Sequence, residues 1–166
     1  VTELKIGITP TLDSLPAESV NATRDPRHEE LGFRFFIHKD TDLPVHEEEY
    51  RIFQTALGIP EMTAGFSESA VFPLDVNLDA LNGIDHKKGC FVGQEVASRM
   101  FRKGEVRKRT YLVLGASLPQ GTTLRQNDRI IGEVTFTIEN LGLAIIRLDR
   151  LDSDSDEADA EGISVT

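Results

Sequence analysis

The chain contains one cysteine, Cys90, and its neighbours are residues that can change the reactivity of a thiol. Lys87 and Lys88 precede it, and apolar residues at helical spacing predict a helix that begins at about Gly93. Nearby cations and the positive end of a helix both favour the thiolate form of cysteine. The pattern therefore allows Cys90 to bind a soft metal ion or to react. A second interpretation, a small apolar side chain in the interior, stays open on these residues alone.

Basic residues are concentrated around this cysteine and after it. Between Lys87 and Arg109 there are eight Lys and Arg residues and two Glu residues, which gives a local charge of +6. The whole chain has 18 basic and 28 acidic residues, a charge of −10, so the remaining residues sum to −16. A molecule with this balance repels polyanions, and a role with nucleic acid would need a strongly localised basic patch. Direct binding of nucleic acid is therefore not expected.

The composition excludes several classes of protein. With a single cysteine the chain can hold neither an internal disulfide framework nor a structural zinc site built from several cysteines, which agrees with a reducing, intracellular setting. No apolar run approaches the roughly 20 residues that a membrane span needs, and the first residues lack the pattern of a signal peptide. We expect a soluble protein with no membrane partner. Because the sequence opens at Val1, we also expect it to be a piece of a longer protein.

Two strands and one helix are predicted before the cysteine. Residues 4–8 alternate in polarity and residues 32–38 are rich in aromatic and β-branched residues, so both segments are predicted to be strands. A helix is predicted over about residues 44–57, with Asp42 as its N-cap and three consecutive Glu residues near its positive end. Its buried face is expected to hold the apolar residues, which are Val45, Ile52, Phe53, Ala56 and Leu57.

After the basic segment, the pattern is typical of a small antiparallel β-barrel. Four stretches rich in β-branched and apolar residues are separated by turn-forming residues at 118–121 and 139–140. The predicted strands cover residues 110–114, 122–125, 129–137 and 141–148. From about residue 152 onward the chain is acidic and has almost no apolar residues, so we expect a disordered tail there.

Residues 88–95, Lys-Gly-Cys-Phe-Val-Gly-Gln-Glu, resemble the signature K-G-C-[YF]-x-G-Q-E of the YgfZ family, and the match extends to Arg99. The members of this family are folate-binding relatives of the glycine-cleavage T-protein, and they include the mitochondrial factor that assists assembly of four-iron four-sulfur clusters. Further segments agree in the same order, and they are residues 25–27, 31–34, 77–79 and 132–135. The resemblance covers nearly the whole chain except the acidic tail.

The resemblance implies an α+β fold with three parts. Residues 1–104 would be the C-terminal part of a folate-binding, T-protein-like body, residues 105–150 a small C-terminal antiparallel β-barrel, and residues 151–166 the acidic disordered tail. It also implies an N-terminal half, roughly as long again, before this sequence. Two positions depart from the common family pattern: Phe136 stands where a Ser is frequent, and Phe91 replaces the more frequent Tyr.

The resemblance also suggests which residues are catalytic. Cys90 would be a reactive thiolate or a transient metal ligand, because iron–sulfur clusters are held by cysteine thiolates. Lys88 would favour that thiolate. One thiolate is too few for a stable cluster, so an iron–sulfur carrier or client protein would supply the other ligands.

A folate cofactor would be bound by polar residues of two segments. Gln94 and Glu95, in the first turn of the predicted helix, could reach the donors and acceptors of a pterin or could cap the helix instead. Asp25 and Arg27 flank a proline, and they could contact the folate or simply pair with each other. Arg99 and the basic residues after it suit the carboxylates of a folate, an acidic partner surface or a solvated face.

We therefore predict a folate-dependent accessory factor in the assembly or repair of iron–sulfur clusters, which would serve cluster-dependent enzymes such as those that modify tRNA. Its cofactor would be tetrahydrofolate or a folate derivative, and a transient cluster would be shared with a partner. The alternative is a tetrahydrofolate-dependent aminomethyltransferase. A thiol-transfer module is a third interpretation, but the chain has no second cysteine. The expected location is the cytoplasm, or the mitochondrial matrix in a eukaryote.

Overall fold

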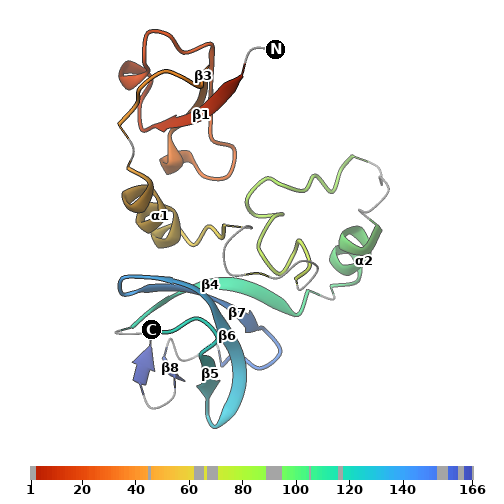
Figure 1. Ribbon diagram of the computed structural model, residues 1–166. Helices are drawn as coiled ribbons and strands as arrows, with labels where there is room; N and C mark the ends of the chain where they lie inside the picture. The colour runs from red at the N-terminus through yellow and green to blue at the C-terminus, as the bar shows by residue number, and fades with distance from the viewer. Residues whose placement is uncertain are drawn as a thin grey trace.

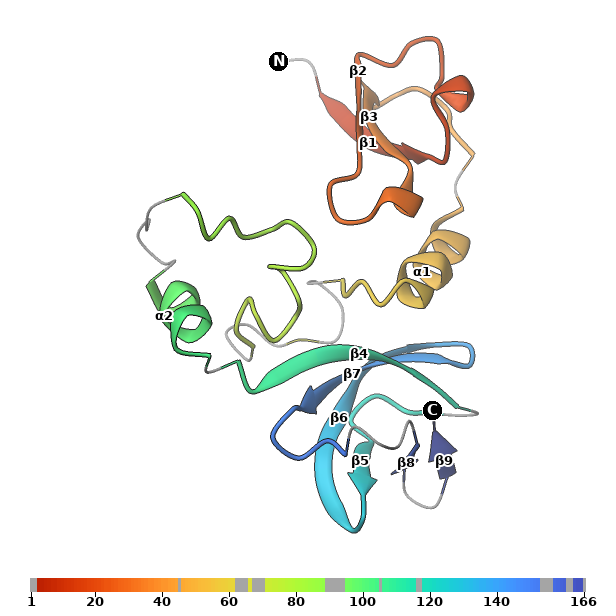
Figure 2. The same ribbon diagram turned by 180° about the vertical axis from the view of Figure 1, so that it is seen from behind.

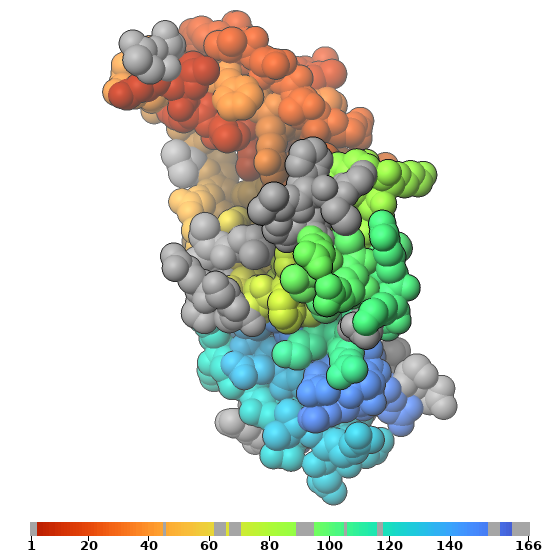
Figure 3. Space-filling model, turned by 90° about the vertical axis from the view of Figure 1, so that its right-hand side faces the viewer, coloured from red at the N-terminus to blue at the C-terminus, as the bar shows by residue number. Residues whose placement is uncertain are grey.

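A computed structural model shows two antiparallel sheets and two α-helices, so the α+β class is confirmed. The structure describes residues 3–44, 46–61, 66, 71–88, 95–104, 106–115, 118–152, 157–160 and 163–165. A three-stranded sheet lies at the N-terminal end and a six-stranded sheet at the other end, with helices and a long irregular segment between them (Figure 1). The space-filling view shows the same succession along an elongated molecule (Figure 3).

The N-terminal sheet consists of β1 (Leu4–Thr9), β2 (Asn21–Arg24) and β3 (Phe33–His38), in the order β1-β3-β2. β1 and β3 confirm the two strands expected from the sequence, whereas the polar residues of β2 gave no strand pattern. Phe35 and Ile37 of β3 are buried. Ile6 of β1 is paired with Phe36, and both of these side chains are exposed. One face of the sheet therefore contributes to the core, and the other face presents apolar side chains.

A tight turn leads into β3 and depends on a glycine. The short 3-10 helix Glu29–Leu31 ends at Gly32, whose φ of 72° lies in the left-handed region. A Cβ at this position would lie 2.3 Å from the carbonyl oxygen of Thr9, which is closer than any such contact can be. Glycine is therefore required here by both its backbone conformation and the close approach of β1.

Helix α1 (Glu47–Ala56) begins three residues later than the sequence predicted, and Asp42 is not its N-cap. The N-cap is His46, which forms no capping hydrogen bond through its side chain. The three Glu residues do occupy the first turn, where the helix dipole favours negative charge.

The buried face of α1 also differs from the expected apolar face. Gln54 and Thr55 are buried, whereas Phe53 is 41% exposed and Ala56 is exposed. The Gln54 amide donates to the carbonyl of Ile59 and the Thr55 hydroxyl to that of Arg51, so both polar groups keep partners inside. This face of α1 packs toward β6 and β7, whereas Phe53 of the predicted apolar face lines a pocket beside β1.

Helix α2 (Glu95–Lys103) confirms the helix predicted after the cysteine. Ala97 is its buried residue, and Val96 and Phe101 are about half exposed. Residues 89–94, which include Cys90 and Gln94, lie outside the described residues. Neither α1 nor α2 is long and apolar enough to cross a membrane, and no other helix in the described ranges is.

The C-terminal sheet has the strand order β4-β7-β6-β5-β8-β9 and curves around its own core (Figure 2). The first four of its strands in chain order confirm the predicted ones. The six strands are β4 (Lys108–Leu114), β5 (Thr123–Gln126), β6 (Arg129–Ile138), β7 (Leu141–Arg147), β8 (Ala158–Ala160) and β9 (Ile163–Val165). The register between β6 and β7 shifts between Val134 and Phe136, an irregularity of the kind that bends a strand.

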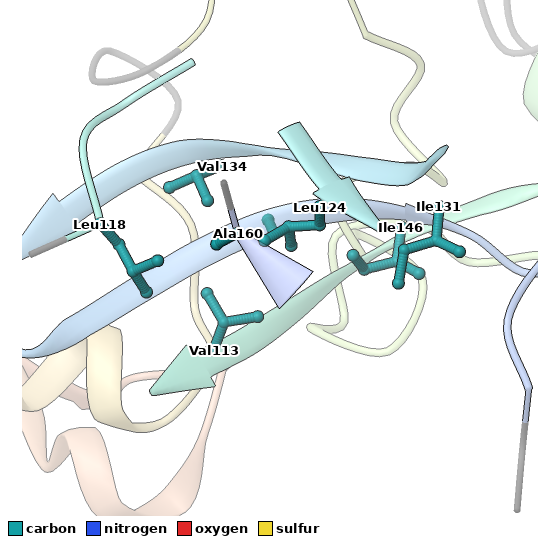
Figure 4. Packing of buried hydrophobic residues seen from close by; sticks show 8 residues of the cluster. Val113, Leu118, Leu124, Ile131, Val134, Ile146 and Ala160 are labelled. Carbon is teal, nitrogen blue, oxygen red and sulfur yellow. The ribbon is translucent and has the colours of Figure 1, made fainter. Parts of the chain in front are cut away.

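Buried side chains from β4 to β8 meet inside this curved sheet (Figure 4). All are aliphatic, and those of β7 come from alternate positions, which share the inner face of the sheet. The cluster consists of Val113, Leu118, Leu124, Ile131, Val134, Ala144, Ile146 and Ala160. Its members lie far apart in the sequence, so the barrel core forms only when the whole sheet has closed around it.

The expectation of a disordered tail after about residue 152 is wrong for the residues that the structure describes there. β8 pairs with β5, β9 pairs with β8, and Ala160 is only 1% exposed. The Gln126 side chain accepts a hydrogen bond from the Asp152 N–H at 2.6 Å and donates to the Glu157 carbonyl at 3.0 Å. Successive side chains of a strand point to opposite faces, so the exposed Asp159 can point outward while Ala160 points into the core. The strand therefore forms although the composition of the segment is acidic.

Replacing Ala160 by Asp should destabilise the barrel, because it places an unpaired carboxylate in the closed core. We expect the free energy of unfolding to fall by about 3 kcal/mol or more, measured by urea denaturation at pH 7. The matched control is Asp159→Ala on the exposed side of the same strand, which should change stability by less than about 1 kcal/mol. Equal stability of the Ala160→Asp variant and the parent protein would contradict the packing of β8.

Candidate functional site

The segment of residues 71–88 leads into the cysteine motif and is attached to the barrel by buried hydrogen bonds. Asn77, with a left-handed φ of 58°, donates its amide to the Thr110 carbonyl at 2.7 Å. The Thr110 hydroxyl in turn donates to the Asp75 carbonyl at 3.0 Å. Leu74 and Val76 have no exposed surface beside these bonds. The segment is therefore fixed to β4 although most of its residues lie in turns.

An ion pair reinforces this attachment. The Arg109 guanidinium of β4 forms two hydrogen bonds with the Asp79 carboxylate, one of them at 2.7 Å, and also donates to the Leu74 carbonyl at 3.0 Å. The hydrogen bonds from Arg109 lower the pKa of Asp79, and the same bonds raise the pKa of Arg109. Arg109 is thus used inside the protein and is not available for the carboxylates of a ligand or a partner.

The other end of the segment reaches the N-terminal sheet. Asn82 also has a left-handed φ of 58°, and its amide donates to the Pro26 carbonyl at 2.7 Å. Pro26 lies between Asp25 and Arg27, two of the residues that the sequence predicted to bind folate. The structure therefore brings the turn of residues 25–27 next to the segment that leads to the cysteine motif. Sequence reasoning had no signal for this contact beyond the turn-forming Asn itself.

Asp25 is a buried carboxylate at the centre of a small polar cluster. It is 2% exposed and accepts four hydrogen bonds. Arg27 supplies three of them, from its backbone N–H at 3.0 Å, Nε at 3.1 Å and Nη2 at 2.9 Å. Arg34 of β3 supplies the fourth from Nε at 2.7 Å. Four donors satisfy both carboxylate oxygens, so Asp25 is a residue that positions two arginines rather than one that contacts a ligand.

The pKa of Asp25 reflects this environment. Burial alone would raise it, but the hydrogen bonds from the side chain and backbone of Arg27 and from Arg34 outweigh burial and lower the pKa to about 2. Arg27 also donates from Nη2 to the Tyr50 hydroxyl of α1 at 2.8 Å. The cluster therefore joins the N-terminal sheet to α1 while it keeps two guanidinium groups partly exposed, with side chains 22% and 36% accessible.

A pocket of about 820 Å³ lies between β1 and α1, beside Tyr50. Its walls are largely apolar and include Ile6, Ile8, Phe35 and Phe53. Four carboxylates also line it, and they belong to Asp13, Glu30, Glu47 and Glu49. The volume is within the range of small-molecule sites, and its apolar lining equally suits packing against another stretch of polypeptide.

The described residues of the cysteine motif lie on the surface. Lys88 is exposed, and the backbone N–H of Lys87 donates to the Asp85 carboxylate at 2.8 Å. Glu95 and Arg99 form an exposed ion pair at 2.7 Å across one turn of α2. An exposed pair of this kind contributes little to stability and can be exchanged for a ligand's groups. Cys90 and Gln94 lie outside the described residues, so their predicted roles stay predictions.

Sequence reasoning missed His86, four residues before Cys90. Its ring stacks on Phe101 of α2 with centroids 3.7 Å apart and planes inclined by 11°. Both ring nitrogens are buried and have no hydrogen-bond partner within the described part of the chain. The stack attaches the residues before the motif to the helix that follows it. No sequence pattern indicated it, because the contact depends on how the chain returns after residue 94.

Comparison with known proteins agrees with this architecture. Residues 107–166 match the family model of the C-terminal beta-barrel domain of CAF17, which includes the strands found after residue 152. Several relatives carry the name iron-sulfur cluster assembly factor IBA57 homolog, mitochondrial. The protein of Dictyostelium discoideum is 33% identical over 60% of this chain, that of Neurospora crassa is 38% identical over 56%, and that of Neosartorya fischeri is 32% identical over 81%.

These relatives are longer than the present chain. The matched region spans 27% of the Dictyostelium discoideum protein, 23% of the Neurospora crassa protein and 38% of the Neosartorya fischeri protein. The chain thus corresponds to between about a quarter and two fifths of each relative. The activity of such a whole protein therefore depends on more polypeptide than the site described above.

Replacing Asp25 by Asn should remove a pH-dependent contribution to stability. A carboxyl whose pKa is lower in the folded state stabilises the fold above its ordinary pKa of 3.8, and this contribution disappears as the pH falls toward about 2. At pH 7 we expect the variant to lose roughly 2 kcal/mol in urea unfolding, and the difference should shrink below pH 4. An exposed carboxyl, Asp13→Asn, is the control; a pH-independent loss for Asp25→Asn would contradict the role of its charge.

Replacing His86 by Phe should leave the protein at least as stable as the parent. Phe preserves the stack on Phe101 and removes two buried nitrogens without partners, so a gain of up to about 1 kcal/mol is expected in thermal and urea unfolding. His86→Ala is the matched control and should lose stability, because it removes the stack as well. A destabilised His86→Phe variant would show instead that a ring nitrogen has a partner outside the described residues.

Proposed function

The chain belongs to the YgfZ-like IBA57/CAF17 family, and on that premise we propose that it acts in the assembly or repair of iron–sulfur clusters with the help of a folate. The observation that carries the proposal is the Asn82–Pro26 contact at 2.7 Å. It joins the turn of residues 25–27, which the family resemblance singled out, to the stretch between residues 77–79 and the Lys88–Glu95 motif, two further segments of that resemblance. The turn that offers cations is thus in contact with the stretch of chain that leads to the motif, which supports a shared site for folate and cluster.

In this proposal the cluster is the cargo of the protein and Cys90 is its transient ligand. A thiolate is the ligand that iron–sulfur clusters use, and the exposed Lys88 two residues earlier favours the charged form. A cluster needs more ligands than one cysteine supplies, so the remaining ones come from a carrier or client protein. Such a shared cluster is released easily, as transfer to a client requires.

The folate part of the proposal rests on the two arginines held by Asp25. Arg27 uses Nε and Nη2, and Arg34 uses Nε, in the bonds to Asp25 and Tyr50 described above. The other guanidinium N–H groups can donate to the carboxylates of tetrahydrofolate, since arginine binds carboxylates through paired donors. Glu95 and Arg99, exposed at the start of α2, can exchange their mutual ion pair for groups of the same ligand.

We also propose that residues 1–104 are part of a larger folate-binding body. Leu4, Ile6 and Ile8 of β1 are each at least 40% exposed, and they line the same side of the strand. The pocket between β1 and α1 has apolar walls on this side of the molecule. Further polypeptide of the kind present in the longer relatives would cover these surfaces. In a eukaryotic cell we propose the mitochondrial matrix as the location, because the relatives are named as mitochondrial proteins.

Replacing Cys90 by Ser in the full-length protein should abolish its support of cluster-dependent enzymes. The readout is the activity of such enzymes in a strain that lacks the gene and carries the variant, and we expect at least a ten-fold loss of the rescued activity. Lys88→Ala should give a partial loss, since less thiolate forms without the neighbouring cation. Lys39→Ala, an exposed lysine on the N-terminal sheet, is the matched control and should rescue fully.

Full rescue by Cys90→Ser would overturn the ligand role. A second experiment incubates the purified full-length parent protein with tetrahydrofolate and an aminomethylated donor protein whose methylene carbon is labelled. Catalytic transfer of the labelled carbon to tetrahydrofolate would favour the alternative function, a tetrahydrofolate-dependent aminomethyltransferase. Binding of tetrahydrofolate in calorimetry without turnover is the outcome that the accessory-factor proposal predicts.

A further inference from the structure

Five cations gather where α2, β4 and β7 meet, and we name this the basic junction surface. Lys108 of β4 lies directly opposite Arg147 of β7, so their side chains share one face of the sheet. Arg107 is beside them, because its carbonyl accepts the N–H of Leu148 at 2.9 Å. The surface consists of Arg102, Arg107, Lys108, Arg147 and Arg150.

This surface differs from the basic segment that the sequence indicated. Arg99 and Arg109 belong to that segment, but they are paired with Glu95 and Asp79. Arg147 and Arg150 take their place, although they lie about 40 residues later in the chain. Figure 3 shows the green stretch of α2 and β4 next to the blue end of β7 on one side of the molecule. Folding thus replaces a run of charges in the sequence by a patch in space.

The patch remains positive after its acidic neighbours are counted. Arg147 pairs with Asp149 at 3.1 Å, and Glu133 of β6 lies opposite Ile145, two residues before Arg147 on β7. Five cations and two carboxylates leave a charge of +3 among these described residues. The chain as a whole carries −10, so the patch is an island of opposite sign. Such an island attracts and orients a partner with a compact acidic face.

Its position connects it to the proposed function, on which this inference rests. α2 starts at Glu95, the last residue of the cysteine motif, and its nine residues end at Lys103, next to Arg102 of the basic junction surface. At a rise of 1.5 Å per residue the two ends of the helix are about 13 Å apart. A small protein domain is about twice as wide as that. A partner docked on these cations is therefore wide enough to reach the start of α2, five residues after Cys90 in the chain.

We propose that the basic junction surface docks an acidic face of the iron–sulfur carrier or client protein that shares a cluster with Cys90. A long polyanion such as tRNA is a poorer match, because the rest of the molecule is strongly acidic and repels it beyond the patch. A compact acidic surface meets only the patch. Electrostatic docking of this kind acts mainly on the rate of association and leaves the chemistry to the cysteine.

The test is a charge reversal, Arg107→Glu with Lys108→Glu, in the full-length protein. The probe is a cluster-loaded iron–sulfur carrier protein from the same organism, and the readout is the association rate constant between 50 and 500 mM salt. We expect the variant to associate at least about ten-fold more slowly at low salt and to lose most of the salt dependence. The matched control reverses two exposed cations of the N-terminal sheet, Arg24→Glu with Lys39→Glu, and should stay within about two-fold of the parent.

Each outcome decides the proposal. Equal effects of the two charge reversals, or a salt-independent association of the parent, would overturn it. The second arm is a parallel titration of the same proteins with tRNA. If the parent and the control bind tRNA and the Arg107/Lys108 variant does not, the surface is assigned to nucleic acid and the proposal of a protein partner is overturned. Cys90→Ser separates this inference from the proposed function: it should associate with the carrier at the parental rate but transfer no cluster.

Discussion

The ion pair between Arg109 and Asp79 is the attachment on which the candidate site depends. It fixes the segment of residues 71–88 to β4, and with Asn77 and Thr110 it forms a network of buried or half-buried hydrogen bonds. Leu74 and Val76 of this segment are fully buried, but most of its residues lie in turns, and burial alone would not fix the path of a turn. Polar groups with defined directions do so, since a hydrogen bond is lost when its geometry changes by a fraction of an ångström. The path of the chain toward the cysteine motif follows from these bonds.

A second buried charge repeats this design at the other end of the segment. Asp25 is enclosed by donors from Arg27 and Arg34, and Asn82 reaches the carbonyl of Pro26 beside it. A buried carboxylate with all its acceptors used contributes specificity more than stability, because any other arrangement leaves a charge without partners. The two arginines are thereby held with part of each guanidinium at the surface. Rigid cations are better suited to recognise a carboxylate than flexible ones, since less side-chain entropy is lost on binding.

Local patterns in the sequence predicted most of the elements, and tertiary contacts decided the rest. β1, β3, α2 and the first four barrel strands follow from alternation or helical spacing. The buried face of α1 does not follow from helical spacing, because Gln54 and Thr55 pack toward the barrel with their polar groups hydrogen-bonded. The strand at Ala160 was also missed, because its pairing with β5 is a tertiary contact that the acidic composition does not indicate. The contacts of Asn82 and His86 join residues far apart in sequence or separated by a loop, and no single-sequence pattern encodes them.

The basic residues of the chain fall into two groups with different physical roles. Those with a carboxylate partner inside the protein, such as Arg109, hold the frame, and their charge is neutralised where they stand. Those at the junction of α2, β4 and β7 outnumber the carboxylates beside them, even with Arg147 paired to Asp149, so a net positive charge remains at the surface. Counting charges along the sequence cannot separate these groups, since the partner of Arg109 lies 30 residues away. The distinction matters because only unneutralised charge reaches far enough to attract another molecule, over roughly one Debye length, about 8 Å under physiological conditions. An acidic protein can in this way keep a selective site for an acidic partner.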